Sequence, residues 1–575
     1  MADDQRPTEG DELERVRQRS PAWTERHPRT VRAIRAPSFL AIALAAFLLV
    51  ESWEPSLLAR DWVFQGVVGG VSLVVGYAVG ALITRFTKLL RRRWGWGVGP
   101  LDERTDLRVR GIVGVVLVAL LARSASKEVA EHRWTWDRLG YEPGSLWAVY
   151  GGSLAVTAVV AALFFLIGWA FRLLQRRLSS LGRRWLPAWI AGSLALVVLA
   201  WAVLATLNNY VLQRSLDGAN TSFASADLDT DGAPSKPDSP LRSGGPRSDV
   251  EWDEAGHEGR RFLSHGPDAA TIAELSPGAA VEPVRVYVGR ASANEVASRV
   301  ELAMAELEHF GAFDRAAVLI VIPTGTGWIN EQIVQPVEYF FGGDTATVAV
   351  QYSHLPSPLA FMAEADAAGD TGAALIDAIR ARLDTIPEGG RPTLLVSGES
   401  LGSFGGAQAF DTLDDLVANT DGSLWVGPPE TMQLRREAER VRSPRSPQIK
   451  PVVGDGEDVV FANRASDLTG TSPRTVFLQQ GDDPIVWWDW GTAFSEPDWL
   501  EEPLDPSVNP AMSWTPVTTF LNLAVDMGVS NDFDEDHGHL YGTQPLTAWR
   551  AMLKPATWDD GRIEELRNRL STVAR

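Results

Sequence analysis

Five long apolar stretches occupy the first third of the chain, at residues 37–52, 63–84, 111–125, 146–174 and 186–207. As helices they are about long enough to cross the ~30 Å hydrocarbon layer of a bilayer, although the first and third are near the short limit. None carries a charged residue near its middle. The pattern therefore predicts an all-α transmembrane bundle of about five helices over residues 37–210.

Basic residues alternate between the connections of these stretches. They are abundant in residues 1–36, between the second and third stretches, and between the fourth and fifth, and they are sparse or balanced by acids elsewhere. Because basic loops remain in the cytoplasm, we expect a cytoplasmic arm at 1–36 and an extracytoplasmic chain after about Asn208. Ion pathways usually need ionisable groups inside the membrane, so a multi-pass anchor in the cell membrane is favoured over a transporter.

The next segment, residues 211–260, is polar and rich in Ser, Pro, Asp and Gly, which predicts a flexible acidic linker. A random coil of ~45 residues would reach ~35–40 Å from the bilayer. Asp227, Asp229 and Asp231 have the spacing of a calcium loop, but Pro234 and Pro237 interrupt it. We therefore expect neither a metal nor another cofactor.

Short β-branched runs alternate with amphipathic segments in the remainder, residues 261–575. Strands are expected at 284–288, 316–322, 346–352, 393–397, 424–426 and 475–479, and helices at 295–310, 330–341, 371–383 and 401–413. Ser292 and Glu295 have the spacing of a capping box for the first of these helices. This alternation predicts a doubly wound, mostly parallel sheet, with its site at the carboxyl ends of the strands.

Composition limits the chemistry. The 575 residues include no cysteine, which excludes disulfides and thiolate catalysis. The net charge is −20, but residues 1–210 hold 26 Lys and Arg against 17 Asp and Glu, whereas the rest holds 27 against 56. An acidic domain argues against a nucleic-acid partner, because nucleic acids bind positive surfaces.

The most informative motif is Gly398-Glu399-Ser400-Leu401-Gly402, which lies between an expected strand and an expected helix. A strand, a tight turn and a helix with serine at the apex form a nucleophile elbow, in which a side chain at either glycine would clash with its surroundings. A glycine-rich turn or a phosphate-binding loop are the alternatives. The context favours Ser400 as a nucleophile.

An activated serine needs a histidine base and an acid that orients it, in the order serine, acid, histidine for this fold. Only His537 and His539 follow the elbow, and we favour His539 as the base with His537 as the alternate. For the acid we favour Asp483, with Asp482 as the alternate, because both follow a late strand. A metal pair of histidines is disfavoured, since no third ligand with suitable spacing follows.

Backbone N–H groups must bind the negative oxygen that forms in such a reaction. The loop at 323–328 follows an upstream strand and contains two glycines, so Gly325 and Thr326 are candidate donors. Leu401, directly after the serine, is the second donor. A nucleotide-binding loop is disfavoured, because neither a Walker lysine nor the Rossmann spacing is present.

Taken together, the ordered motifs of the chain resemble those of a known family. The motifs are Thr324-Gly-Thr-Gly-Trp328, Gln351-Tyr-Ser353, the elbow, Trp425-Val-Gly-Pro-Pro429, Asp483-Pro-Ile-Val-Trp-Trp488 and His537-Gly-His-x-Tyr541. The chain resembles the actinobacterial membrane-anchored α/β-hydrolase family over nearly its whole length. The resemblance implies a multi-helix N-terminal domain, a serine hydrolase fold and no defined substrate. One position departs from the family pattern. The resemblance implies a Gly-His-Gly-His motif, and Asp536 replaces its first glycine in this chain.

Several functions are compatible with these features. The first is an extracytoplasmic serine esterase or lipase, or an acyltransferase with the same acyl-enzyme, acting on lipid or envelope esters. The others are a non-catalytic envelope-binding protein and a transporter with a hydrolase-like appendage. Aromatic residues near the expected site could line an acyl pocket or could be ordinary core; they are Trp328, Tyr339, Phe340, Phe341, Trp487, Trp488 and Trp490.

Overall fold

The computed structural model describes residues 39–94, 131–142, 145–182, 187–206 and 213–573, with a few isolated residues at 111–119 and at 185. The chain divides into two compact units. The first consists of Met1–Glu54, Asp61–Ala130 and Gly144–Gly168, and the second of Pro55–Arg60, Glu131–Pro143 and Trp169–Arg575.

The first unit is helical. It contains α4 (Phe39–Glu51), α5 (Trp62–Trp94) and the beginning of α7 (Leu146–Gly182). Helices α4 and α5 approach closely at Gly76 and Gly80; a methyl group on Gly80 would lie 2.6 Å from the Cα atom of Ala41. Glycine thus allows the two backbones to pack where a larger residue would separate them.

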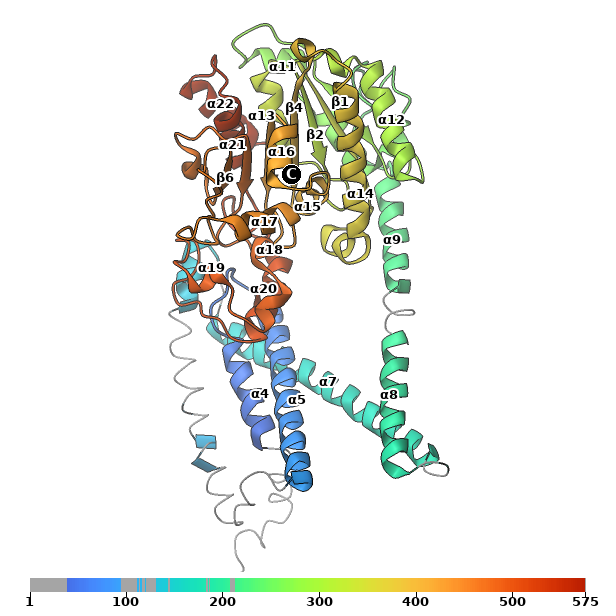
Figure 1. Cartoon of the computed structure of the whole chain (residues 1–575), viewed down its shortest axis with the longest axis vertical. Helices are drawn as coiled ribbons and strands as arrows, with labels where there is room; N and C mark the ends of the chain where they lie inside the picture. The colour runs from blue at the N-terminus through green and yellow to red at the C-terminus, as the bar shows by residue number, and fades with distance from the viewer. Residues whose placement is uncertain are drawn as a thin grey trace, which may run out of the picture. The chain divides into compact units, whose positions relative to one another are not determined.

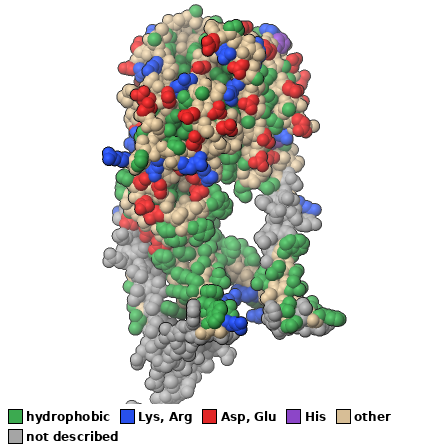
Figure 2. Space-filling model, viewed as in Figure 1, with side chains coloured by type: hydrophobic (Ala, Val, Ile, Leu, Met, Phe, Trp, Pro, Cys, Tyr) green, Lys and Arg blue, Asp and Glu red, His purple; other side chains and the backbone are tan. Residues whose placement is uncertain are grey.

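The expectation of five spanning helices is not supported. Among the described residues, two helical segments are long and apolar enough to cross a membrane, Trp62–Leu90 and Val149–Gly182. Helix α4 has 13 residues, which rise about 20 Å and fall short of a bilayer. The third apolar stretch, 111–125, lies largely outside the described residues. Figure 2 shows mainly hydrophobic side chains on the first unit.

A seven-stranded sheet forms the centre of the second unit. Its order is β1-β3-β2-β4-β5-β7-β6, and all neighbouring strands are parallel. The strands are β1 (Val284–Val288), β2 (Ala317–Ile322), β3 (Thr345–Val350), β4 (Thr393–Glu399), β5 (Gly422–Val426), β6 (Val459–Ala462) and β7 (Thr475–Leu478). Six of the seven were predicted, because strands buried on both faces are continuously apolar; β6 was missed.

Helices cover both faces of this sheet (Figure 1). One face packs against α12 (Val296–His309), α14 (Ser357–Leu383), α15 (Leu401–Ala407), α16 (Leu413–Asn419) and α17 (Gln433–Val441). The other packs against α10 (Gly256–His265), α13 (Glu331–Phe340) and α21 (Gln544–Leu553), with α11 (Ala269–Ala273) and α22 (Asp560–Ser571) outside α13. The predicted doubly wound architecture is therefore confirmed.

Two details differ from the predictions. The helix expected at 401–413 ends at Ala407, and a separate helix, α16, begins at Leu413. Thr412 caps α16 by accepting a hydrogen bond from the Asp415 N–H group. The capping box expected at Ser292 and Glu295 does not form; Glu295 is the N-cap of α12 and its side chain makes no capping hydrogen bond.

The segment expected to be a flexible linker is folded onto the second unit. Residues Gln213–Leu228 form α9, after α8 (Ala188–Thr206). Buried Asp227 binds the Nδ1 atom of His354 (2.8 Å) and accepts a hydrogen bond from Gln351 Nε2 (3.0 Å). Arg260 donates to its carbonyl oxygen at 2.9 Å. These partners lie far along the chain, so the local polarity of the segment did not reveal them.

Two connections from the first third of the chain also belong to the second unit, residues 55–60 and 131–143. Their apolar side chains enter a buried cluster that includes Leu57, Leu58, Trp136, Leu139, Trp487, Trp499 and Leu523. This cluster lies beside the short helices α18 (Pro484–Trp487), α19 (Asp498–Glu501) and α20 (Thr518–Asp526).

A buried ion pair fastens the first of these connections. The Arg60 Nε atom lies 3.3 Å from an Asp526 carboxylate oxygen, and Arg60 Nη1 donates to Asn522 Oδ1 at 2.9 Å. Ser56 also donates to Asp526. Burial raises the pKa of the Asp526 carboxyl, while the Arg60 charge and the hydrogen bond from Ser56 oppose that rise. Neither partner can lose the other without leaving a buried charge.

We predict that Asp526→Ala destabilises the second unit by about 3–5 kcal/mol, because Arg60 is left buried and unpaired. Thermal unfolding of the purified chain should show a clearly lower midpoint. The matched control is Asp532→Ala, which removes an exposed aspartate nearby in sequence and should leave the midpoint unchanged. Equal midpoints for the two variants would refute the role of this ion pair.

Candidate active site

Ser400 lies at the turn between β4 and α15 in a backbone conformation that non-glycine residues rarely adopt. Its φ and ψ angles are 54° and −119°. A side chain on Gly398 would overlap the backbone of Gly402, and one on Gly402 would overlap the carbonyl group of Ile322 at the end of β2. The two glycines are therefore required by close backbone approach, as a nucleophile elbow demands.

Hydrogen bonds hold the turn in this conformation. The Ser400 N–H group donates to the Val426 carbonyl at 2.9 Å, which ties the elbow to the end of β5. Ser403, one turn into α15, donates to the Gly398 carbonyl at 2.7 Å. The serine side chain is thus presented at the carboxyl ends of the central strands, where α/β sheets place their sites.

His539 and Asp483 form a buried pair. The His539 Nδ1 atom lies 2.7 Å from Asp483 Oδ2, so Nδ1 carries the proton that is shared with the carboxylate. The other carboxylate oxygen of Asp483 accepts the Ile485 N–H group at 2.9 Å. Burial lowers the pKa of His539, but the charge and hydrogen bond of Asp483 outweigh it, and the pKa is raised above 6.5.

Tyr541 is a further partner of this pair that was not assigned a role from the sequence. Its hydroxyl donates to Asp483 Oδ2 at 2.7 Å and accepts the Gln480 N–H group at 3.1 Å. Tyr541 lies two residues beyond His539 in the same loop motif. This position in the sequence could have identified it as a neighbour of the proposed base. The tyrosine fixes the acid in the orientation that binds the histidine.

The His539 ring lies close to the end of β5, the strand end that also binds the elbow. A side chain on Gly427 would overlap the Cε1 atom of His539, and Gly427 directly follows Val426, which binds the Ser400 N–H group. Within the described residues, His539 Nε2 is buried without a hydrogen-bond partner. No hydrogen bond joins it to Ser400, a contact that often tightens only when substrate is bound.

The two alternates form a pair of their own. His537 Nδ1 lies 3.1 Å from Asp482 Oδ2, separate from the His539 and Asp483 pair. Burial raises the pKa of Asp482, and the hydrogen bond and charge of His537 oppose that rise. The favoured and alternate residues are therefore sorted into two neighbouring pairs, and the favoured pair is the one beside the elbow.

The loop at 323–328 begins next to the elbow, but one proposed donor is already used. The Gly325 N–H group donates to Ser357 Oγ at 3.2 Å, so Gly325 does not offer its N–H to a substrate in this structure. The N–H groups of Thr326 and Leu401 have no acceptor within the described residues. Gly327, with φ at 90°, lets the loop pass close to Tyr287, whose hydroxyl donates to the Gly327 carbonyl.

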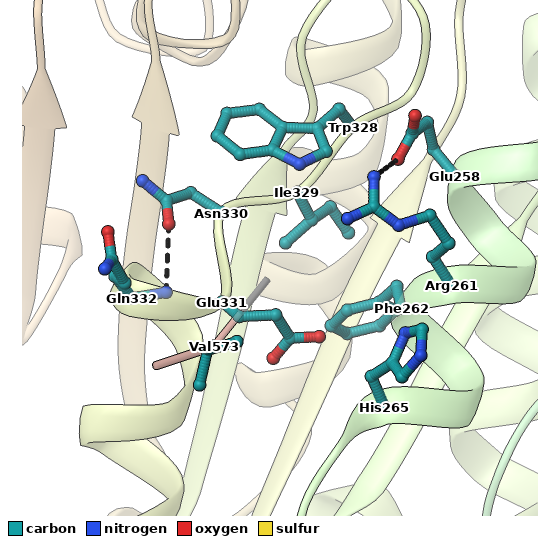
Figure 3. A pocket seen from close by; sticks show the side chains of 10 residues that line it. All are labelled: Glu258, Arg261, Phe262, His265, Trp328, Ile329, Asn330, Glu331, Gln332 and Val573. Atoms are coloured by element: carbon teal, nitrogen blue, oxygen red, sulfur yellow. Dashed lines mark hydrogen bonds and ion pairs between the residues drawn. The ribbon is translucent and has the colours of Figure 1, made fainter. Parts of the chain in front are cut away.

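Another residue missed from the sequence is Asn330. Its side-chain nitrogen donates to the carboxylate of Glu399 at 2.8 Å, which links the loop after β2 to the residue before Ser400. A small pocket lies next to this loop, lined by Trp328, Glu331, Phe262 and Arg261 among others (Figure 3). Ser400 does not line it.

The aromatic residues expected near the site differ in how deeply they are buried. Tyr339 and Trp487 are fully buried core side chains, as the alternative interpretation proposed. Trp490, by contrast, is 67% exposed. Its ring contacts those of Trp488 and Phe520 in edge-on and tilted arrangements, with ring centres 5.2–5.3 Å apart. The second unit thus carries an aromatic cluster in which the Trp490 side chain is exposed.

The described residues contain no group of three or more His, Cys, Asp or Glu side chains that could hold a metal ion. The second unit carries a strained serine at the elbow, Ser400, and a buried histidine, His539, held by Asp483. This arrangement suits acyl transfer through the serine hydroxyl.

Comparisons with known proteins agree with this geometry. Residues 284–566 match a family described as "Alpha/beta-hydrolase family", and residues 53–267 match one described as "Alpha/beta-hydrolase family N-terminus". Neither a curated protein nor a solved structure matches the chain.

We predict that Gly398→Ala destabilises the second unit by ~1–3 kcal/mol, because the new methyl group overlaps the backbone of Gly402. Thermal unfolding measures the loss. Gly389→Ala is the matched control, since a methyl group there meets no atom within 4 Å. An unchanged melting midpoint for Gly398→Ala would show that the turn is not as tightly packed as described.

Proposed function

We infer that the chain is a serine hydrolase that acts on ester bonds. Its two family matches support an α/β-hydrolase. The observations that support this most strongly are the strained backbone of Ser400 at the elbow and the buried His539 that is held by Asp483. Family membership supports a hydrolytic activity in general. The serine mechanism and the ester substrate are our proposal.

The proposed reaction begins with the Ser400 hydroxyl. Its oxygen attacks the ester carbonyl carbon while His539 Nε2 accepts the proton, and Asp483 stabilises the resulting imidazolium. The N–H groups of Leu401 and Thr326 bind the negative oxygen of the tetrahedral intermediate. Collapse releases the alcohol, which takes a proton from His539, and leaves an acyl-enzyme. Water then completes hydrolysis, whereas a second alcohol would complete acyl transfer.

We predict that Ser400→Ala lowers turnover of p-nitrophenyl butyrate by at least about 10⁴-fold, because no nucleophile remains. Initial rates for the purified chain measure this. Ser495→Ala, which changes an exposed serine elsewhere in the second unit, should leave the rate unchanged. Turnover by Ser400→Ala close to that of the wild type would exclude Ser400 as the nucleophile.

We propose that the substrate carries a long acyl chain and lies at a membrane surface. The aromatic cluster around the exposed Trp490 supports this, since tryptophan and phenylalanine favour the interface between water and lipid. The acidic balance of the C-terminal part also disfavours soluble anionic substrates.

A series of p-nitrophenyl esters from acetate to palmitate tests this proposal. We expect kcat/KM to rise with chain length beyond butyrate, because more apolar surface is buried in the transition state. Trp490→Ala should reduce the rate for palmitate and leave the rate for acetate unchanged. Activity confined to acetate would show that the site has no room for a long acyl chain.

We further propose a multi-pass membrane location with the catalytic unit outside the cytoplasm. Two apolar helices of sufficient length support the membrane location. The alternation of basic connections supports the orientation. An alkaline phosphatase reporter fused after Asn209 should be active, because it is exported, and one fused after Arg93 should be inactive. The reverse pattern would place the catalytic unit in the cytoplasm.

A further inference from the structure

Two buried side chains hold the loop at 323–328 from the sheet side. Gln351 directly follows β3, and its side-chain nitrogen donates to the Thr326 carbonyl at 3.0 Å. Tyr287 of β1 donates its hydroxyl to the Gly327 carbonyl at 2.9 Å. A side chain on Gly327 would lie 2.2 Å from this hydroxyl and 2.9 Å from Gln351 Cγ. Both residues therefore pack directly against the turn that carries the proposed donor Thr326.

The orientation of the Gln351 amide is fixed from both ends. Its oxygen accepts the Arg290 N–H group at 3.0 Å. Its nitrogen lies 3.0 Å from each of three acceptors, which are the carbonyls of Thr326 and Ser353 and the carboxylate of Asp227. Exchanging oxygen and nitrogen would place an acceptor against these three acceptors. Within the described residues, the Thr326 carbonyl has no other donor, so Gln351 alone anchors it by a hydrogen bond.

Asp227, near the end of α9, completes this arrangement. Its Oδ2 atom accepts the hydrogen bond from Gln351 and binds His354 Nδ1 at 2.8 Å. Its Oδ1 atom accepts the His257 N–H group, in the first turn of α10, at 2.8 Å. Three polar partners from distant segments thus surround one buried carboxylate. The position of α9 is linked through this carboxylate to the Gln351 side chain and hence to the loop.

The turn closes without using the N–H group of Thr326. Its closing hydrogen bond joins the Gly327 N–H group to the Thr324 carbonyl at 2.9 Å, and the Thr324 N–H group donates to the Trp328 carbonyl at 3.0 Å. The loop begins against the elbow, because a side chain on Gly402 would lie 3.0 Å from the Pro323 carbonyl oxygen. Since the Thr326 carbonyl and N–H group belong to one residue, anchoring the carbonyl limits the rotation that would turn the N–H group away.

We propose that Gln351 and Asp227 are positioning residues for the proposed reaction. They do not contact the substrate; they hold the Thr326 N–H group where it can bind the negative oxygen of the tetrahedral intermediate. The inference rests on the proposed ester hydrolysis. It gives a role to two sequence features that the catalytic residues leave unexplained, the Gln351-Tyr-Ser353 motif and the first of the spaced aspartates. Helix α9 is then a part of the catalytic apparatus.

Kinetics of Gln351→Ala test this role. We expect kcat for p-nitrophenyl butyrate to fall at least ~10-fold with KM within about twofold of the wild type, because outright loss of one such donor costs about 10²–10³ in kcat. An octyl trifluoromethyl ketone provides a second measurement. The Ser400 hydroxyl adds to the ketone, His539 takes the proton and the ketone oxygen becomes negative, so its inhibition constant should rise by a similar factor.

Two further variants keep the size of the side chain, so they remain informative if Gln351→Ala is unstable. Tyr287→Phe removes the hydroxyl from the Gly327 carbonyl, and Asp227→Asn leaves one acceptor oxygen for three partners. Each should lower kcat by ~3–5-fold, about the contribution of one hydrogen bond, again with KM unchanged. Gln433→Ala, which removes an exposed amide on α17, is the matched control and should behave as the wild type.

Hydrogen exchange followed by mass spectrometry reports on the loop without requiring any turnover. Peptides that contain Thr324 and Gly327, whose N–H groups are hydrogen-bonded in the turn, should exchange faster in Gln351→Ala and Asp227→Asn than in the wild type. A wild type that cleaves no ester would defeat the proposed function and leave this measurement readable. Unchanged exchange, unchanged kcat, or a lower kcat with unchanged inhibition by the ketone would overturn the positioning role.

Discussion

The backbone of Ser400 is the constraint on which the rest of the site depends. A serine at φ 54° costs of order 1–3 kcal/mol and persists only where its surroundings impose it. Here the backbones of β4, α15 and β2 meet so closely that Gly398 and Gly402 admit no side chain. The buried parallel sheet supplies that rigidity, and the hydrogen bond from Ser400 to Val426 transmits it to β5.

The acid and the base depend on a different part of the molecule. Asp483 begins α18, and His539 lies in a loop after α20, so neither is held by the sheet alone. The cluster around Trp487 and Trp499 packs beneath them, and residues 55–60 and 131–143 contribute to it. Segments from the first third of the chain are therefore part of the core that supports the catalytic loops. The ion pair of Arg60 and Asp526 closes this core.

Features that depend on local pattern could be predicted from the sequence. Strands such as 317–322 are continuously apolar because both faces are buried, and the elbow is readable because its glycines and its strand–helix context are contiguous. Features that depend on distant partners could not. The folding of α9 rests on Arg260, Gln351 and His354, and the loss of Gly325 as a donor rests on Ser357.

We propose that His539 activates Ser400, and the rate of covalent labelling of the serine tests this activation. The chain is treated with a fluorophosphonate at a series of pH values, labelling is followed by intact mass, and the modified residue is identified by peptide mass spectrometry. The base must be neutral to accept the proton, and the charge and hydrogen bond of Asp483 raise the pKa of His539 above that of a free histidine. We expect one adduct, on Ser400, with a labelling rate that rises with pH as His539 loses its proton. Labelling at another residue, or a rate with no such rise, would contradict it.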